Sequence, residues 1–407
     1  MENNIDWGKY EQASEEEKIQ MLIDWTEVGD AEAQYQLGIR YYFGEGVSVD
    51  HEQAEKWFRL SAEQGNAGAQ FNLGAFYHQG DESKRDMGEA VRWYKLSAEQ
   101  GEVDAQFNLG LMYKEGDGVN KDVEEAIRWY KLSAEQGYAP AQYNLGLLYQ
   151  EGDGVKRDVA ETFHWLKMAA EQGYAPAQCS LGVLYRNGEG VNKDIEEAIR
   201  WFKLSAEQGD FRAQINLGLL FQKGNGVKKD IKEAIRWFKK AAEQGQAIAQ
   251  WILGNIYSYG KDVDIDYSEA LNWYKLAAEQ GLAVAQNSLG FMYALGEGVA
   301  VDYTEARKWF QFAAEQGNKE AQCNLGVIYE KGDGVPQDLS EAMRWYKMSA
   351  EQGYCSAQCY LGGLYLEKDL DEAVRWYKMA AEQGSDEAKK ALMEIEKFKQ
   401  RDHDRLE

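Results

Sequence analysis

The sequence predicts an all-α solenoid built from ten copies of a 36-residue helix-turn-helix unit. The dipeptide Leu-Gly recurs ten times between Leu37 and Leu361, always 36 residues apart. Apolar and small residues in each interval form two stretches of helical spacing, separated in most copies by a glycine-rich turn signal. The 407 residues therefore belong to a repeat array rather than to two or three globular domains.

The array is predicted to have three parts. Residues 1–30 hold a capping helix, in which Ser14 and Glu17 form an N-terminal capping box. Residues 31–385 hold the ten repeats, and residues 386–407 hold a C-terminal capping helix that keeps the first-helix pattern without a second helix. Half-repeats of this kind close the exposed faces of a stack, so we expect a complete array.

The third repeat illustrates how local signals place each helix pair. Asp122 and Glu125 form a capping box that opens the second helix, because the Asp oxygen accepts an exposed helix N–H and the Glu reaches back. Gly137 suits the left-handed residue that ends this helix. A mid-helix glycine such as Gly110 costs about 1 kcal/mol relative to alanine. We expect a compensating contact, with Trp129 of the second helix filling the space.

Composition and charge exclude several classes of function. The chain carries 69 acidic and 45 basic side chains, a net charge of −24, so nucleic acid and anionic membrane are not expected ligands. No apolar run approaches the roughly 18 residues that span a bilayer. No secretory signal precedes the array. These observations predict a monomeric cytoplasmic protein. Delivery into a host cell by a signal-less route is an alternative that they do not exclude.

Catalytic and metal sites are not expected. The recurring Asp-x-x-Glu carboxylates are helix caps, and the turns lack the spacing of a calcium loop or a phosphate-binding loop. Cys323, Cys355 and Cys359 supply three thiols without a fourth ligand. Ser258 and Lys261 form a lone Ser-x-x-Lys without its companion motifs. The sequence thus predicts a protein that is not an enzyme and that has no cofactor.

One copy of the repeat nearly spells out a known consensus, at Ala139, Ala141, Gln142, Leu145, Gly146, Tyr149, Gly152, Gly154, Val155, Asp158, Glu161, Trp165, Ala169, Ala170, Glu171, Gln172 and Gly173. The pattern resembles the Sel-one-like repeat, a relative of the tetratricopeptide repeat, over residues 31–385. This resemblance implies a right-handed superhelix whose concave wall is lined by the first helices. It also implies an adaptor or scaffold in signalling, protein quality control or bacterium–host contact.

Partner-binding candidates follow from analogy with the tetratricopeptide repeat, in which side chains two before and two, five and six after this Leu face the groove. The position two before Leu begins with four aromatic residues, Tyr35, Phe71, Phe107 and Tyr143. The position five after Leu varies throughout and includes Tyr42, His78 and Arg186. Variation favours recognition of an irregular partner, because the scaffold positions hardly vary. Packing between successive first helices is the alternative for the aromatic residues.

Two repeats depart from the pattern and supply further candidates. In the seventh, Trp251 and Tyr259 bring aromatic side chains into the first helix, and the turn at residues 260–263 loses its second glycine. In the second, residues 80–83 replace the usual Gly-x-Gly-Val. Departures from a rigid pattern are candidate functional sites. Drift in a surface loop is the alternative.

The functional hypothesis is a non-catalytic scaffold that binds a peptide or protein in the groove. Aromatic side chains are frequent anchors at interfaces, and the negative field favours a basic partner. A secreted or host-directed bacterial effector or virulence adaptor is an alternative, as is a self-assembling structural component. A cell-wall-related hydrolase is the weakest alternative, because the penicillin-linked members of the family carry a disulfide in each repeat. Here a pair in each repeat is not supplied by the four cysteines, Cys179, Cys323, Cys355 and Cys359.

Overall fold

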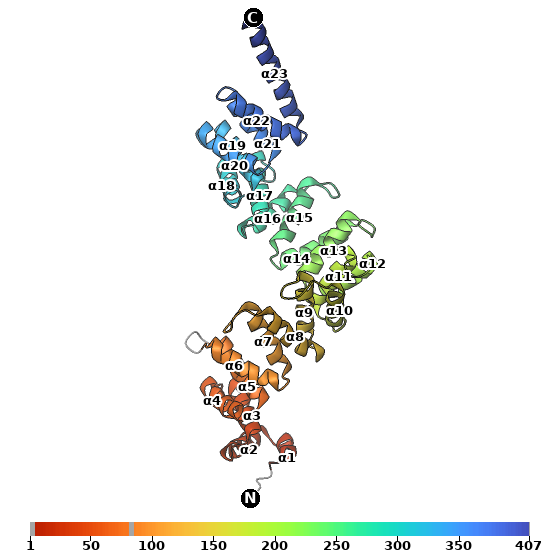
Figure 1. Ribbon diagram of the computed structural model, residues 1–407, viewed down its shortest axis with the longest axis vertical. Coiled ribbons are helices and arrows are strands. Elements are labelled where there is room, and N and C mark those ends of the chain that lie inside the picture. The colour runs from red at the N-terminus through yellow and green to blue at the C-terminus, as the bar shows by residue number, and fades with distance from the viewer. Residues whose placement is uncertain (1–4, 81–84, 407) are drawn as a thin grey trace. The chain divides into compact units, whose positions relative to one another are not determined.

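The computed structural model describes residues 5–80 and 85–406, with side chains described as far as residue 400. All regular secondary structure in these residues is α-helical, which confirms the predicted fold class (Figure 1). The chain divides into two compact units, the N-terminal unit (residues 1–210) and the C-terminal unit (residues 211–407). Within each unit, a first helix packs on the second helix of its own repeat, and that helix packs on the next first helix.

The N-terminal unit holds two leading helices and five repeats. The leading helices are α1 (Trp7–Gln12) and α2 (Glu15–Glu27). The first helices of the repeats are α3 (Ala31–Phe43), α5 (Ala67–Gln79), α7 (Val103–Glu115), α9 (Ala139–Glu151) and α11 (Ala175–Asn187). Their second helices are α4 (His51–Glu63), α6 (Met87–Glu99), α8 (Val123–Glu135), α10 (Val159–Glu171) and α12 (Ile195–Glu207).

The C-terminal unit holds five repeats and a final helix. Its first helices are α13 (Phe211–Lys223), α15 (Ala247–Tyr259), α17 (Ala283–Leu295), α19 (Lys319–Lys331) and α21 (Cys355–Tyr365). Its second helices are α14 (Ile231–Glu243), α16 (Tyr267–Glu279), α18 (Tyr303–Glu315), α20 (Leu339–Glu351) and α22 (Leu370–Glu382). The final helix α23 (Asp386–Leu406) packs on α22.

The segment before the first repeat contains two helices, whereas the sequence predicted one. The full capping box of Ser14 and Glu17 opens α2 as expected. The additional helix α1 begins after Asp6, whose side chain accepts a hydrogen bond from a backbone N–H of the first turn. The Trp7 ring lies edge-on to the Trp25 ring of α2, with centroids 4.9 Å apart. This aromatic contact joins α1 to another helix, and the local sequence pattern therefore did not predict α1.

The Asp caps of the second helices are confirmed in all ten repeats. In the third repeat, Asp122 Oδ1 accepts from the Glu125 backbone N–H at 3.1 Å. The predicted return bond of the capping box is wrong here, because the Asp122 N–H donates to the Tyr113 carbonyl at 2.8 Å. The Glu125 carboxylate instead accepts from Arg128 at 3.1 Å. The cap therefore ties the second helix to the end of the first.

The recurrent mid-helix glycine is explained by close contact between the two helices of a repeat. A β-carbon on Gly110 would lie 2.7 Å from the Tyr130 ring. The prediction that Trp129 fills this space is wrong by one residue. Trp129 instead packs with Tyr94 of the preceding repeat. The residue that faces the glycine in successive repeats is Phe58, Tyr94, Tyr130, Leu166, Phe202, Phe238, Tyr274, Phe310, Tyr346 or Tyr377.

Buried glutamines connect neighbouring helices and account for another recurrent residue. Gln142 is fully buried, and its Nε2 donates to the carbonyl of Ala134 in the preceding repeat at 3.0 Å. Its Oε1 accepts from Gln172 Nε2 at 2.7 Å. The same glutamine pair occurs in every repeat. These bonds satisfy a buried amide, so the conserved Gln within the repeat is structural.

Candidate functional site

The recurrent residues of the repeat are occupied by structural contacts, so candidate binding residues are those that vary on the first helices. We call the side chains two, five and six after the Leu of Leu-Gly the first-helix face. In the first repeat these positions hold Ile39, Tyr42 and Phe43, and in the second repeat they hold Ala75, His78 and Gln79. They are half-buried or exposed, whereas the Leu and Gly of each pair are buried.

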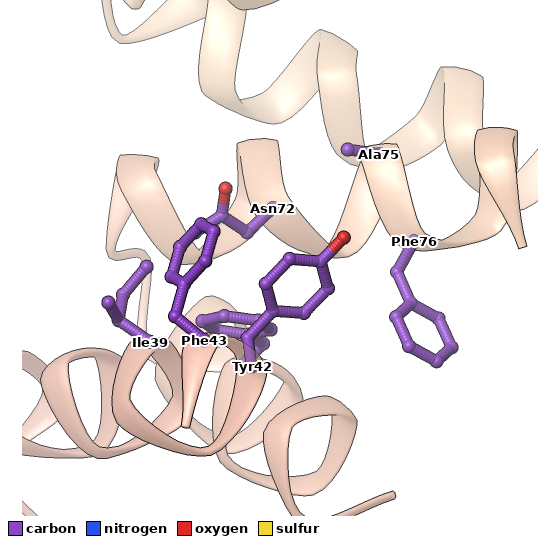
Figure 2. A pocket seen from close by; sticks show the side chains of 7 residues that line it. Ile39, Tyr42, Phe43, Asn72, Ala75 and Phe76 are labelled. Carbon is purple, nitrogen blue, oxygen red and sulfur yellow. The ribbon is translucent and has the colours of Figure 1, made fainter. Parts of the chain in front are cut away.

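A small pocket opens on this face between α3 and α5. Its volume is about 80 Å³ and it is lined by Ile39, Tyr42, Phe43, Phe58, Asn72, Ala75 and Phe76. Figure 2 shows the rings of Tyr42 and Phe43 rising from α3 toward α5, which carries Asn72. The Tyr42 ring rests on neighbouring rings, with centroids 5.2 Å from His51 and 6.4 Å from Phe58.

The size and lining of the pocket favour a side chain of a partner over a cofactor. Small-molecule sites usually enclose about 300–1,000 Å³, several times the volume found here. Phe43 is 62% exposed and Tyr42 is 40% exposed, so both rings present apolar surface to solvent. Asn72 is the one amide side chain in the lining and supplies a hydrogen-bonding group at the rim. Such a pocket can hold the apolar tip of one side chain.

The predicted aromatic row is half-buried and packs within and between repeats. The Tyr35 ring lies over Gly68, where a β-carbon would come within 2.9 Å of it. Similar ring contacts join Phe71 to Tyr94 at 5.7 Å, Phe107 to Tyr138 at 5.2 Å, and Tyr143 to Tyr174 at 5.5 Å. The geometry assigns these four rings to packing between helices. Their part in partner binding stays a prediction.

The other predicted residues lie on separate helices. His78 of α5 has its Nδ1 3.5 Å from the Tyr94 hydroxyl, and Arg186 of α11 donates from Nε to Asn187 Oδ1 at 3.2 Å. In the C-terminal unit, Trp251 of α15 is half-buried and donates from Nε1 to Ser288 Oγ at 3.3 Å. Tyr259, at the end of α15, is 75% exposed.

The two irregular turns differ in what the structure describes. In the seventh repeat, Asp262 replaces the second turn glycine, and its carboxylate pairs with Lys229. Gly260 keeps the left-handed conformation, with φ of 58°. Apart from Gly80, the irregular turn of the second repeat lies in residues 81–84, outside the described residues. The Asp at the irregular turn of the seventh repeat therefore has a structural role, because it forms an ion pair.

Sequence reasoning named Tyr42 but missed Phe43, the most exposed ring of the pocket. The available signal was its position six after Leu, which in the next four repeats holds Gln79, Glu115, Glu151 and Asn187. It also missed Phe291 and Leu295 of α17, which are exposed on the same face of their helix. Phe43 and Leu295 are apolar residues at a position that is polar in most other repeats, whereas the position of Phe291, two after Leu, is apolar in most repeats.

Thiols and carboxylates show no arrangement for metal binding in the part of the chain that the structure describes. None of the four cysteines, all of which lie in the described residues, forms a disulfide, and Cys323 is buried. Burial raises the pKa of Cys323 to about 12, so its thiolate is scarce at neutral pH. In the same described residues, no helix is both long and apolar enough to cross a membrane.

Alkylation should therefore distinguish the cysteines. Cys355, which is half-buried, is expected to react with iodoacetamide at pH 8 at least about a hundredfold faster than Cys323, because the thiolate is the reactive form. Peptide mass spectrometry over a time course measures both rates on the folded protein. Equal rates would contradict the burial of Cys323, and a denatured sample provides the control in which both should react alike.

Comparison with known proteins places the chain in a family. The family model described as Sel1 repeat matches ten segments, at residues 31–66, 67–102, 103–138, 139–174, 175–210, 211–246, 247–282, 283–318, 319–354 and 356–385. The chain belongs to the Sel1 repeat family. The predicted resemblance is thereby confirmed for the ten repeats.

Solved structures with a similar chain support this membership. The Sel1 repeat protein described here is 35% identical to a protective antigen present in uropathogenic Escherichia coli strains, over 93% of this chain and 90% of that chain, with a TM-score of 0.67. A Sel1 repeat protein from Oxalobacter formigenes is 36% identical, over 76% of this chain and 89% of that chain, with a TM-score of 0.63. Among curated proteins, none matches the sequence significantly.

Proposed function

We propose that this Sel1 repeat protein is a non-catalytic scaffold that binds a peptide or protein partner on its first-helix face. The pocket of Tyr42 and Phe43 carries the proposal, because it combines exposed aromatic surface with a depth suited to one apolar side chain. Aromatic residues around a pocket are typical of interface anchors. The stacked helices are already ordered, so the scaffold loses little conformational entropy on binding.

The charge of the chain favours a basic partner. A net charge of −24 produces a negative field that attracts and steers positively charged proteins. Many carboxylates are used in local pairs, such as Glu125 with Arg128, and these contribute little binding energy of their own. Increasing salt should therefore slow association more than it weakens the apolar contact in the pocket.

A capture experiment tests the proposal. The wild-type chain and a Tyr42→Ser/Phe43→Ser variant are used as baits in lysate of the source organism, with circular dichroism to verify folding. A specific partner is expected to be retained by the wild type and reduced about tenfold or more by the variant, since hot-spot losses of this kind exceed about 1.4 kcal/mol. A Leu96→Ser/Leu132→Ser bait removes two equally apolar side chains, each 38% exposed on second helices, as the matched control.

The three baits distinguish specific binding at the pocket from nonspecific binding to exposed apolar side chains. Equal retention by all three baits would reject the pocket as the binding site. Equal loss with both variants would show that any exposed apolar side chain supports capture, and would also reject it. Only selective loss with the pocket variant supports the proposal.

A host-directed role is a second candidate, favoured by one observation. The relative that is 35% identical over nearly the whole chain is a protective antigen in uropathogenic Escherichia coli strains. An antigen of this kind meets the host, so the partner of the present chain would then be a host protein. Repeating the capture with host-cell extract shows whether the partner comes from the host or from the source organism. The same pocket variant serves as the control.

A further inference from the structure

In the C-terminal unit, two neighbouring first helices carry exposed apolar side chains. Ile248 and Tyr259 of α15 are 54% and 75% exposed, and Val284, Phe291 and Leu295 of α17 are 38%, 41% and 63% exposed. We call these five residues the α15–α17 patch. Residues separated by seven or eleven positions share one face of a helix. Each helix therefore presents its apolar residues as a single row.

Hydrogen bonds link α15 to α17 and α17 to α19. Trp251 of α15 donates to Ser288 of α17 at 3.3 Å. Asn324 of α19 donates to Asn287 of α17 at 2.9 Å. The Phe291 ring packs edge-on against Phe310 of α18, with centroids 5.4 Å apart. The base of the patch is thus built from fixed contacts, while its outer surface stays exposed.

Neither α15 nor α17 contains a charged residue, in contrast to their neighbours α13 and α19. Leu295 occupies a position that holds Glu115 in α7, Glu151 in α9 and Lys331 in α19. The fold therefore does not require an apolar residue there. Exposed apolar side chains gathered on neighbouring helices commonly mark an interaction site, because leaving them in water is unfavourable.

The surroundings of the patch are acidic. Residues 247–318, the two repeats that form it, contain nine acidic and four basic side chains. Asp264 and Glu297 lie in the turns that follow α15 and α17, and Glu320 is bonded to Asn287 at 3.3 Å. Lys261, which follows α15, is the basic residue nearest in sequence to the ends of the rows. The net charge of these two repeats therefore complements a basic partner.

We propose that the α15–α17 patch docks the apolar face of a basic amphipathic helix of a partner protein. An eleven-residue row on an α-helix is about 16 Å long. This footprint matches about three turns of an amphipathic helix, which recognises a groove through anchors spaced at helical intervals. The proposal deepens the scaffold function, on which it rests, and names the chemistry of one partner segment.

Two synthetic peptides of about 18 residues, each with one leucine face and a polar face of either lysine or glutamate, serve as probes. Binding to the full chain is measured by fluorescence anisotropy at physiological salt. The lysine peptide is expected to bind at least about tenfold more tightly than the glutamate peptide. Equal affinity, or no binding of the lysine peptide, would overturn the proposal.

Variants locate the binding site of the lysine peptide. Phe291→Ser/Leu295→Ser is expected to weaken its binding about tenfold or more. The control Leu276→Ser/Phe312→Ser removes apolar residues that are 45% and 42% exposed on second helices, and is expected to leave the affinity within about twofold. Equal losses with both variants would overturn the assignment, and circular dichroism confirms that each variant folds.

Light scattering tests the competing occupant, a second copy of the chain. A wild-type dimer that becomes a monomer on Phe291→Ser/Leu295→Ser substitution would show self-association through the patch and overturn the proposal. A monomer in both cases supports it. Because the capture experiment on Tyr42 and Phe43 concerns other helices, the scaffold function can stand when this proposal fails.

Discussion

Replacing Trp129 with alanine is expected to lower the free energy of unfolding around the third repeat by about 3–5 kcal/mol. The Trp129 side chain is only 3% exposed and packs with Tyr94 of the preceding repeat. It also contacts the core around Leu109 of its own first helix. Truncation leaves a cavity between two repeats, and a repeat array depends on contacts between neighbours.

Two further substitutions serve as comparisons for the Trp129→Ala variant. Leu132→Ala on the same helix removes a side chain that is 38% exposed and is expected to cost less than about 1 kcal/mol. Trp129→Phe keeps most of the volume and breaks no hydrogen bond, because the indole N–H has no acceptor among the described residues. Urea unfolding followed by circular dichroism measures all three. A Trp129→Ala variant as stable as Leu132→Ala would contradict the packing described here.

Replacing Gly326 with alanine is expected to lower the free energy of unfolding by about 2 kcal/mol, although alanine is the better helix former by about 1 kcal/mol. A β-carbon at Gly326 would overlap the ring of Tyr346. That ring is fully buried, and its hydroxyl donates to Glu330 Oε2 at 2.6 Å, so it has little room to move aside. Overpacking then outweighs the gain in helix propensity.

The adjacent repeat supplies a matched control for Gly326. A β-carbon at Gly362 would lie 3.1 Å from the Tyr377 ring, which leaves a tight but tolerable contact. Gly362→Ala is therefore expected to change stability by less than about 1 kcal/mol, because strain and helix propensity nearly cancel. Hydrogen exchange in α19 to α22 measures both variants locally. Equal destabilisation by the two substitutions would contradict the proposed dependence on ring distance.

The candidate site was only partly predictable from the sequence. Tyr42 was named from its position in the repeat and lies at the pocket between α3 and α5. The aromatic row beginning at Tyr35 was identified by the same analogy, but its rings pack within and between repeats. Exposure of an aromatic ring depends on what the neighbouring repeat places against it, and this is not visible in one repeat. Phe43 and Leu295, by contrast, were missed although they lie six after Leu, a position expected to face the groove.

The sequence by itself determined the repeat number, the helix pairs and their limits. These limits follow from local chemistry, since Asp122 accepts a hydrogen bond within its own helix turn and Gly137 adopts a positive φ of 93° just after the helix end. Tenfold repetition made each local signal unambiguous. Family membership followed from the same recurrent residues.

Only the tertiary structure decided which side chains those helices bury and which they expose. Gly110 faces Tyr130 rather than Trp129, and the Asp122 N–H bonds to Tyr113 across the turn. These contacts depend on the orientation of one helix against another, which helical periodicity fixes only to about one residue in a turn. Exposed surface is what remains after such contacts form, so the pocket beside Tyr42 and the exposure of Phe43 were decided by the fold and not by the repeat pattern alone.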